Sequence, residues 1–290
     1  MDPDVEAQLV LQRDVVADSS TAEEFRRPSP QCSPCGSARL GSGLVAMLVP
    51  GIISCTFIPF VLRNPALPEP WALADVTVFL VLLSLLVASW LQAVFIDAGT
   101  TPAQWHDMIA NRPASERNEF RWCTKTNMYR PPRSHFDSVT RRVVLNMDHF
   151  CPWVANTVGF YNRKFFVLFL VYTFLTTGYA GTSSFLWHGV DTSSVPIGGG
   201  DFTSLEFSLL LNTVLCVTVG GFAGFHIKMV LCNETSIELG GGFCGRGPYN
   251  VGWRANLESV AGKTPWLWLV PVYGSGPVGD GINWPTSGVT

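Results

Sequence analysis

The chain has 290 residues, of which 47% are hydrophobic and only 14% are charged, with a formal net charge of −3 at pH 7. Soluble domains ordinarily carry about 25% charged residues. The deficit is concentrated in four windows without Asp, Glu, Lys or Arg, which argues against a soluble protein. A signal peptide fits the first window poorly, because residues 1–42 precede it.

Residues 1–42 are polar and are predicted to form a cytosolic, disordered N-terminal tail. Within this tail Cys32 and Cys35 form an isolated Cys-x-x-Cys pair, which is a weak metal or redox signal. A flexible tail that carries two thiols is the simpler interpretation, and lipid attachment is a minor alternative.

The four apolar windows are each close to the ~20 residues that a helix needs to cross a bilayer core. We therefore predict an all-α integral membrane protein with four transmembrane helices, two within residues 43–96 and two within residues 165–231. Pro50 and Pro59 would kink the first helix. The windows cover residues 43–62, 76–96, 165–187 and about 207–227. No internal repeat is evident.

The distribution of Lys and Arg predicts the orientation. Of the 19 basic residues, all but Arg63 lie before the first window, between the second and third, or after the fourth. These three segments are therefore predicted to be cytosolic, with both termini inside. Basic residues between positions 112 and 164 would suit anionic headgroups or a phosphate-bearing ligand. Nucleic acid fits less well, because the patch is tethered at a membrane.

The run most informative about chemistry lies between the second and third windows and includes Asp148, His149 and Cys151. A thiolate is nucleophilic, a His can take the thiol proton, and a carboxylate can orient the imidazole. Pro152 favours extended backbone at Cys151, so that His149 and Cys151 would face the same way and Asp148 away, unless the backbone turns. Such a trio alone is more often structural, but this one lies near a membrane interface.

The run resembles the cysteine-rich domain of the DHHC palmitoyltransferases, with Asp148-His149-Phe150-Cys151 in place of Asp-His-His-Cys. The resemblance extends from the first window to about Gly262. Further motifs match the family's Asp-Pro-Gly, Thr-Thr-x-Glu and C-terminal Asn-containing motifs. They are Asp97-Ala98-Gly99, Thr235-Ser236-Ile237-Glu238, and Pro248-Tyr249-Asn250 with Asn256.

The resemblance implies a protein S-palmitoyltransferase. Cys151 would attack palmitoyl-CoA and pass the acyl group to cysteines of membrane-associated proteins, with His149 as the base and Asp148 as its orienting partner. It implies a cytosolic catalytic domain over residues 97–164, a cytosolic tail over 232–290, and an endoplasmic reticulum, Golgi, other endomembrane or plasma-membrane location. Supporting roles fall to Thr235, Ser236, Glu238 and Asn256, and candidate contacts to the CoA phosphates are Arg130, Arg133, Arg141 and Arg142.

The chain departs from the family at the metal sites. The family builds this domain around two zinc ions, and most of the matching positions lack a zinc ligand. We therefore predict no zinc and no other bound cofactor, with apolar residues packing in place of the metal. The positions are Cys123, Thr126, Phe136 and Val143 for the first site and Asp137, Thr140, Phe150 and Thr157 for the second. His135, next to a lost ligand position, is interpreted as structural.

Two other functions stay open at this point. A catalytically weak family member would act as a scaffold or chaperone for membrane partners. An unrelated channel or transporter with four spans is disfavoured, because its spans would be expected to contain ionisable residues and these windows contain no acidic or basic ones.

Overall fold

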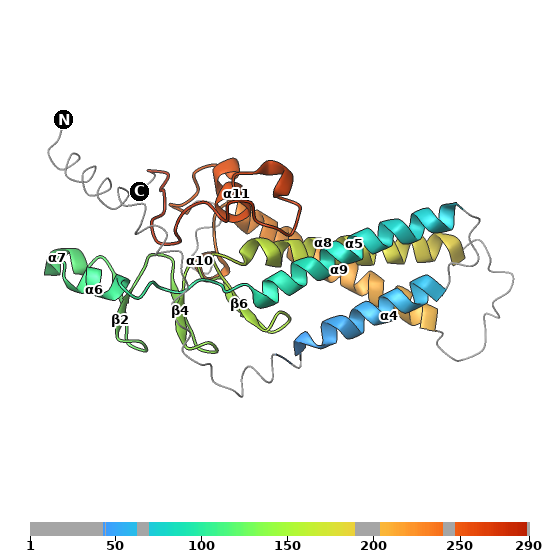
Figure 1. Cartoon of the computed structure of the whole chain (residues 1–290), viewed down its shortest axis with the longest axis horizontal. Coiled ribbons are helices and arrows are strands. Elements are labelled where there is room, and N and C mark those ends of the chain that lie inside the picture. Colours follow the sequence, from blue (N-terminus) through green and yellow to red (C-terminus); the bar gives the residue numbers. More distant parts are fainter. Residues whose placement is uncertain (1–42, 44, 63–69, 189–203, 240–246, 289–290) are drawn as a thin grey trace.

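The computed structural model describes residues 43, 45–62, 70–188, 204–239 and 247–288. The predictions for residues 1–42, including the Cys32 and Cys35 pair, therefore lie outside the described residues. Four long helices run alongside one another in Figure 1, and α8 packs against both α5 and α9. These helices are α4 (Leu48–Leu62), α5 (Trp71–Phe95), α8 (Arg163–His188) and α9 (Ser204–Leu231).

Three of the described helices are long and apolar enough to cross a membrane: α5, α8 over Arg163–Leu186, and α9 over Glu206–Leu231. Large apolar side chains on α5, such as Leu73 and Phe95, are exposed on the outside of the bundle, where lipid would cover them. Helix α4 has 15 residues. At 1.5 Å per residue it extends roughly 22 Å, short of the ~30 Å hydrocarbon core. A helical membrane protein with three candidate spans is thus supported, and the fourth span is not confirmed.

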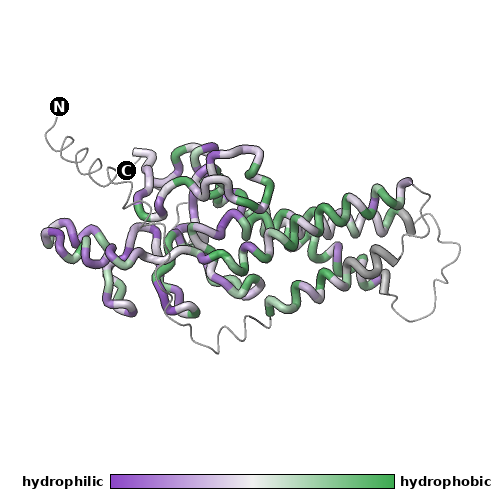
Figure 2. Tube along the Cα trace, in the orientation of Figure 1, coloured by the Kyte–Doolittle hydropathy of each residue, from purple (hydrophilic) through white to green (hydrophobic). Residues whose placement is uncertain are grey.

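Three antiparallel β-hairpins lie between α5 and α8, so the prediction of an all-α protein is wrong. They occupy one end of the molecule, where Figure 2 shows the hydrophilic residues concentrated, whereas the helices are largely hydrophobic. The pairs are β1 (Arg121–Cys123) with β2 (Met128–Arg130), β3 (His135–Asp137) with β4 (Arg142–Val144), and β5 (His149–Cys151) with β6 (Asn156–Val158).

The hairpins form an internal repeat that the sequence reading missed. Successive hairpins begin 14 residues apart, and in each the residue before the second strand has a positive φ: 51° at Asn127, 55° at Arg141 and 47° at Ala155. This left-handed backbone lets a short loop reverse the chain, although it is sparsely populated by residues other than glycine. The repeat places Cys123, Asp137 and Cys151 at equivalent positions, each the last residue of a first strand.

Hydrogen bonds from β6 hold the third hairpin against the end of the helix bundle. The last carbonyl groups of a helix have no partner within it. Here Asn156 Nδ2 donates to the carbonyls of Ala93, Val94 and Ile96 at the end of α5. Gly159 lies so close to the segment after α5 that a Cβ there would be 2.7 Å from the Ala98 carbonyl oxygen. The site residues that follow are therefore fixed relative to the membrane helices.

The remaining elements frame this end of the molecule. Trp105 and Ile109 of α6 join an apolar cluster with Phe160 and Ile282. At the start of α8, Lys164 Nζ donates to the carbonyls of Leu267 and Val272, which ties the C-terminal segment to the bundle. The elements are α6 (Trp105–Ala110) and α7 (Ala114–Arg117) before the hairpins, and α10 (Ser236–Leu239), α11 (Trp253–Ala261) and a 3-10 helix (Pro265–Leu267) after α9.

Candidate active site

The three predicted catalytic residues meet at the start of the third hairpin. The Oδ2 atom of Asp148 and the Nδ1 atom of His149 are 2.7 Å apart, and the Cys151 side chain hydrogen-bonds the same imidazole. The chain turns before Asp148, with a φ of 44° at Asn146, and the Asp148 N–H donates to the Val158 carbonyl of β6. Asp148 lies just before β5, outside the regular strand, and its carboxylate contacts the His149 ring.

Asp148 is buried and is surrounded by positive and donor groups. The Ser236 N–H donates to Oδ1 at 2.8 Å, and the Ser236 hydroxyl donates to the Asp148 backbone carbonyl. Arg163 Nη2 lies 3.9 Å from Oδ1, and His226 Nδ1 lies 4.0 Å from Oδ2. Burial alone would raise the pKa of this carboxyl, but the His149 hydrogen bond, the Arg163 charge and the Ser236 N–H hold that pKa well below its usual range.

The pKa of His149 is shifted in the opposite direction. Burial acts to lower the pKa of its imidazole, but the hydrogen bonds to Asp148 and Cys151 outweigh burial and raise that pKa to about 9. At neutral pH the ring is therefore an imidazolium that donates Nδ1–H to Asp148. This positive charge lies beside the Cys151 thiol. The pair is suited to attack an electrophilic carbonyl carbon.

The other side of Cys151 faces the helix bundle. Cys151 is buried and belongs to an apolar cluster to which all four long helices contribute. Among its members are Val49 of α4, Ala93 of α5, Phe169 of α8 and Ala223 of α9. The Cys151 thiol thus lies between the His149–Asp148 pair and apolar side chains of the helix bundle.

The Thr235-x-x-Glu238 motif forms the cap of helix α10. The Thr235 N–H donates to Glu238 Oε2 at 2.9 Å, and the Glu238 N–H donates to Thr235 Oγ1 at 3.3 Å, which is a reciprocal capping box. Glu238 also accepts two hydrogen bonds of 2.7 Å from Arg133. The cap fixes Ser236 at the point where it contacts Asp148.

The four arginines predicted to contact phosphate have different surroundings. Arg133 is buried, lies against the rings of Tyr249 and Trp284, and is engaged with Glu238, so it points into the protein. Arg142 pairs with Asp97 at 2.6 Å, and Arg130 Nη1 donates to the Ser134 carbonyl at 3.4 Å. Arg141, at the turn of the second hairpin, is exposed.

Asn256 links α11 to the end of α9. Its side chain is buried, and Nδ2 donates to the Leu231 carbonyl at 2.7 Å and to Asn250 Oδ1 at 2.8 Å. Its Oδ1 accepts the Val251 N–H. Leu231 ends α9 shortly before Ser236, which contacts Asp148. Asn256 therefore holds the segment that contacts Asp148 without itself contacting Asp148.

The residues at the two family zinc positions do not fit a zinc ion. In the second group, Asp137 Oδ2 accepts the Thr140 hydroxyl at 2.6 Å and also the Thr157 hydroxyl, and Oδ1 accepts the Val139 N–H. Phe150 lies directly opposite Thr157 in the β5–β6 pair. The one carboxylate is thus saturated by local donors, and Phe supplies no ligand.

The first group shows the same loss of ligands. Phe136 and Val143 lie opposite each other in the β3–β4 pair, and neither can bind a metal. Cys123 is buried, and although burial acts to raise its pKa, hydrogen bonds from Thr126 and Lys125 lower it. Cys123 therefore accepts donors at the start of its hairpin loop, as Asp137 does in the equivalent loop.

Two residues near Asp148 were missed by the sequence reading, namely Arg163 at the start of α8 and His226 near the end of α9. An ionisable residue at the edge of an apolar window is costly and is a signal that could have pointed to them. Ligand atoms of Asp148, His149 and His226 lie within 4.8 Å of one another. Since Asp148 and His149 already hydrogen-bond each other, this group is better suited to holding a proton than a metal.

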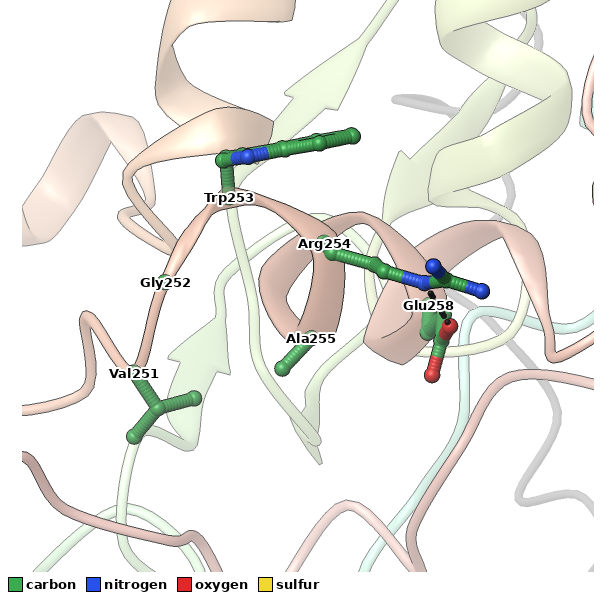
Figure 3. Close-up of a pocket in the computed structure, with 6 residues that line it drawn as sticks. All are labelled: Val251, Gly252, Trp253, Arg254, Ala255 and Glu258. Atoms are coloured by element: carbon green, nitrogen blue, oxygen red, sulfur yellow. Dashed lines mark hydrogen bonds and ion pairs between the residues drawn. The ribbon is translucent and has the colours of Figure 1, made fainter.

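A surface pocket on α11, drawn in Figure 3, is separate from this site. Its walls include Trp253, Arg254 and Ala255, which are exposed, and Arg254 pairs with Glu258 at 3.2 Å. None of the residues that contact Asp148 lines it.

Comparison with known proteins agrees with the geometry. A model of the DHHC palmitoyltransferase family matches residues 116–239. The chain is 32% identical over 264 residues to the probable protein S-acyltransferase 13 of Arabidopsis thaliana, covering 82% of this chain and 87% of that relative. It is 37% identical over 170 residues to the palmitoyltransferase ZDHHC15 of Xenopus laevis, covering 57% of this chain and 50% of that protein. The resemblance seen in the sequence is confirmed, and the chain belongs to the DHHC palmitoyltransferase family.

Proposed function

We propose that this protein transfers a fatty acyl group from palmitoyl-CoA, through an acyl-Cys151 intermediate, to cysteines of membrane-associated proteins. It is a protein S-acyltransferase. The observation that carries the proposed mechanism is the position of Cys151, whose thiol meets the His149–Asp148 pair on one side and the apolar cluster of the helix bundle on the other.

In the first half-reaction the Cys151 thiolate attacks the carbonyl carbon of the palmitoyl thioester. A bond forms between the Cys151 sulfur and the acyl carbon, and the bond between that carbon and the CoA sulfur breaks. CoA leaves as a thiolate and takes the proton of the His149 imidazolium. The imidazole is then neutral, and Asp148 stays hydrogen-bonded to its Nδ1.

In the second half-reaction neutral His149 accepts the proton of the acceptor cysteine. The acceptor sulfur attacks the acyl carbon, the bond to Cys151 breaks, and Cys151 leaves as a thiolate. The imidazolium–thiolate pair is restored. Asp148 stabilises the imidazolium and fixes its orientation in both steps, without itself taking a proton.

The acyl chain and the CoA phosphates would be held by different parts of the chain. A C16 acyl chain gains about 0.8 kcal/mol per buried CH₂, so apolar side chains between the helices make a strong acyl site. Of the four predicted phosphate contacts, the exposed Arg141 and the partly exposed Arg130 and Arg142 are supported by their accessibility. Arg133 is assigned instead to the Glu238 pair.

Three further properties belong to the proposal. The domain folds without zinc, supported by the saturated Asp137 carboxylate and the Phe136–Val143 pair. Residues 43–62 complete a fourth span, and both termini face the cytosol, supported by the distribution of Lys and Arg. An endomembrane location, with the plasma membrane as the alternative, rests on the family resemblance.

The test is capture of the acyl-enzyme. Purified full-length protein is incubated with labelled palmitoyl-CoA and then treated with hydroxylamine, which cleaves thioesters. We expect hydroxylamine-labile label on the wild type and none on Cys151→Ser, with Cys55→Ser as a matched cysteine control that keeps the label. An unlabelled wild type would instead favour a catalytically weak scaffold.

A further inference from the structure

Arg163 is the largest fully buried side chain in the described part of the protein, and it is a cation. It is the first residue of α8, where the chain enters the membrane-facing bundle. Its Nη2 donates to the Glu234 carbonyl, but Nε and Nη1 have no hydrogen-bond partner among the described residues. Burying a charge in this way is expensive, so a compensating interaction is required.

The compensating charge is the catalytic carboxylate. Arg163 Nη2 lies 3.9 Å from Asp148 Oδ1, and both side chains are almost completely buried. This separation is too long for a hydrogen bond, so Arg163 acts on Asp148 by charge and leaves its hydrogen bonds to His149 and Ser236 undisturbed. A guanidinium is always protonated in proteins, whereas the His149 imidazolium exists in only some steps of the cycle.

That difference matters after the first half-reaction, when His149 has given its proton to the leaving CoA. The buried Asp148 carboxylate then faces a neutral imidazole, and without another cation it would pull a proton back onto His149. Arg163 is the permanent positive charge in contact distance of Asp148 at that moment.

We propose that Arg163 is a positioning residue whose charge offsets part of the Asp148 charge while His149 is neutral, and thereby makes neutral His149 available to take the proton of the acceptor thiol. This inference rests on the proposed two-step function, and it concerns the second step. Asp148 is thus the shared partner of His149, which gains and loses a proton during the cycle, and of Arg163, which stays charged.

The other charged groups around the pair do not replace Arg163. His226 of α9 approaches Asp148 Oδ2 at 4.0 Å, but its ring is enclosed by Phe166, Phe222 and Phe225. Cys151 faces His149 from β5. Arg133 and Glu238 also act on Arg163, but they are bonded to each other in a bidentate pair, so their charges largely cancel.

The test separates the two half-reactions in wild type, Arg163→Gln and Arg163→Lys. Gln keeps a polar side chain but lacks the charge, and Lys keeps the charge. In Arg163→Gln, acyl transfer from the acyl-enzyme to a cysteine peptide should slow on the order of tenfold at neutral pH, with its acid limb moved to higher pH, because His149 holds its proton more tightly. The acylation burst, which uses the imidazolium, should change by less than about threefold.

Lys at position 163 should keep the wild-type pH dependence of the transfer step, and Arg254→Gln is the matched loss of one exposed positive charge. Equal pH dependence in Arg163→Gln and wild type would overturn the inference, as would equal slowing of both half-reactions. If Arg163→Gln fails to fold, the pair Asp148→Asn/Arg163→Gln removes both buried charges and should restore folding. Failure of that pair to fold while Asp148→Asn folds would contradict the charge role.

An absent burst in the wild type would overturn the proposed function itself. A normal burst with an unchanged transfer step in Arg163→Gln would overturn only the role of Arg163.

Discussion

Asp148 organises the site at the level of single residues. Its two oxygens accept from His149 and Ser236, its backbone carbonyl accepts from the Ser236 hydroxyl, and Arg163 supplies a charge. Residues from β5, α8 and α10 are thus joined through one buried carboxylate. A buried anion is stable only when such partners are all present, so the site is preorganised before any substrate binds.

The pKa of His149 makes stability depend on pH. Because that pKa is raised in the folded protein from 6.5 to about 9, protonated His149 stabilises the fold fully below pH 6.5, and this contribution is lost as the pH rises through 9. We expect the free energy of unfolding to fall by roughly 3 kcal/mol more in wild type than in His149→Gln between pH 6.5 and 9.5. Thermal unfolding in detergent at the two pH values measures this difference in the free energy of unfolding.

His106→Gln is the control for this experiment, because His106 lies on α6 away from the Asp148 site and should keep the wild-type slope. Identical slopes in wild type and His149→Gln would contradict the assignment. The effect of Asp148 on stability has the opposite pH dependence. Because its pKa is lowered in the folded protein, ionised Asp148 stabilises the fold above its ordinary pKa of 3.8, and this stabilisation is lost in more acidic solution.

At the scale of elements, hydrogen bonds and apolar contacts hold the repeated hairpins together. In the second hairpin Asp137 gathers the hydroxyls of Thr140 and Thr157, so one carboxylate connects β3, its loop and β6. Phe136 and Val143 add apolar contact across the β3–β4 pair. A metal would otherwise supply the folding free energy of such short strands.

We expect Asp137→Ala to lower the free energy of unfolding by about 2 kcal/mol, because it leaves buried hydroxyls without their acceptor. EDTA should leave the unfolding temperature of the wild type unchanged, and elemental analysis should find no stoichiometric zinc. Asp107→Ala, at an exposed carboxylate, should be nearly neutral. A chelator-sensitive unfolding temperature, or zinc at one per chain, would refute this account.

These strands also show what the sequence could not predict. Each has three residues, too few for the alternation of polar and apolar residues that indicates a β-strand. The repeat resides in backbone conformation at Asn127, Arg141 and Ala155, three residue types without a shared side-chain chemistry. Long apolar helices, by contrast, are visible in composition alone, and α5, α8 and α9 lie where the windows were predicted.

For the molecule as a whole, the site combines residues that are neighbours in the sequence with residues that only the packing of the helices brings together. Asp148, His149 and Cys151 are close in sequence and were predictable together. The contacts from Arg163, His226 and Ser236 depend on how α8, α9 and α10 converge, which pairwise spacing along the chain does not determine.

The orientation in the membrane is tested by glycan mapping. We expect an engineered Asn-x-Thr acceptor within residues 63–69 to be glycosylated, because the proposed span over residues 43–62 would place them outside the cytosol. Acceptors placed in residues 1–42 should stay unmodified. An acceptor within 189–203 is the positive control, and the native Asn233-Glu234-Thr235 sequence, predicted to be cytosolic, is an internal negative one. Glycans on the N-terminal segment would contradict the four-span orientation.

The burial of Cys151 among side chains from all four long helices has a kinetic consequence. In the proposed mechanism the acyl chain stays among these apolar side chains as it passes from the bilayer to Cys151 and onward to an acceptor. The collisions that matter then occur within a plane, between molecules that share one leaflet. Turnover is therefore governed by the number of donors and acceptors per unit area of membrane, and dilution of the surrounding aqueous volume leaves it unaffected once both are membrane-bound.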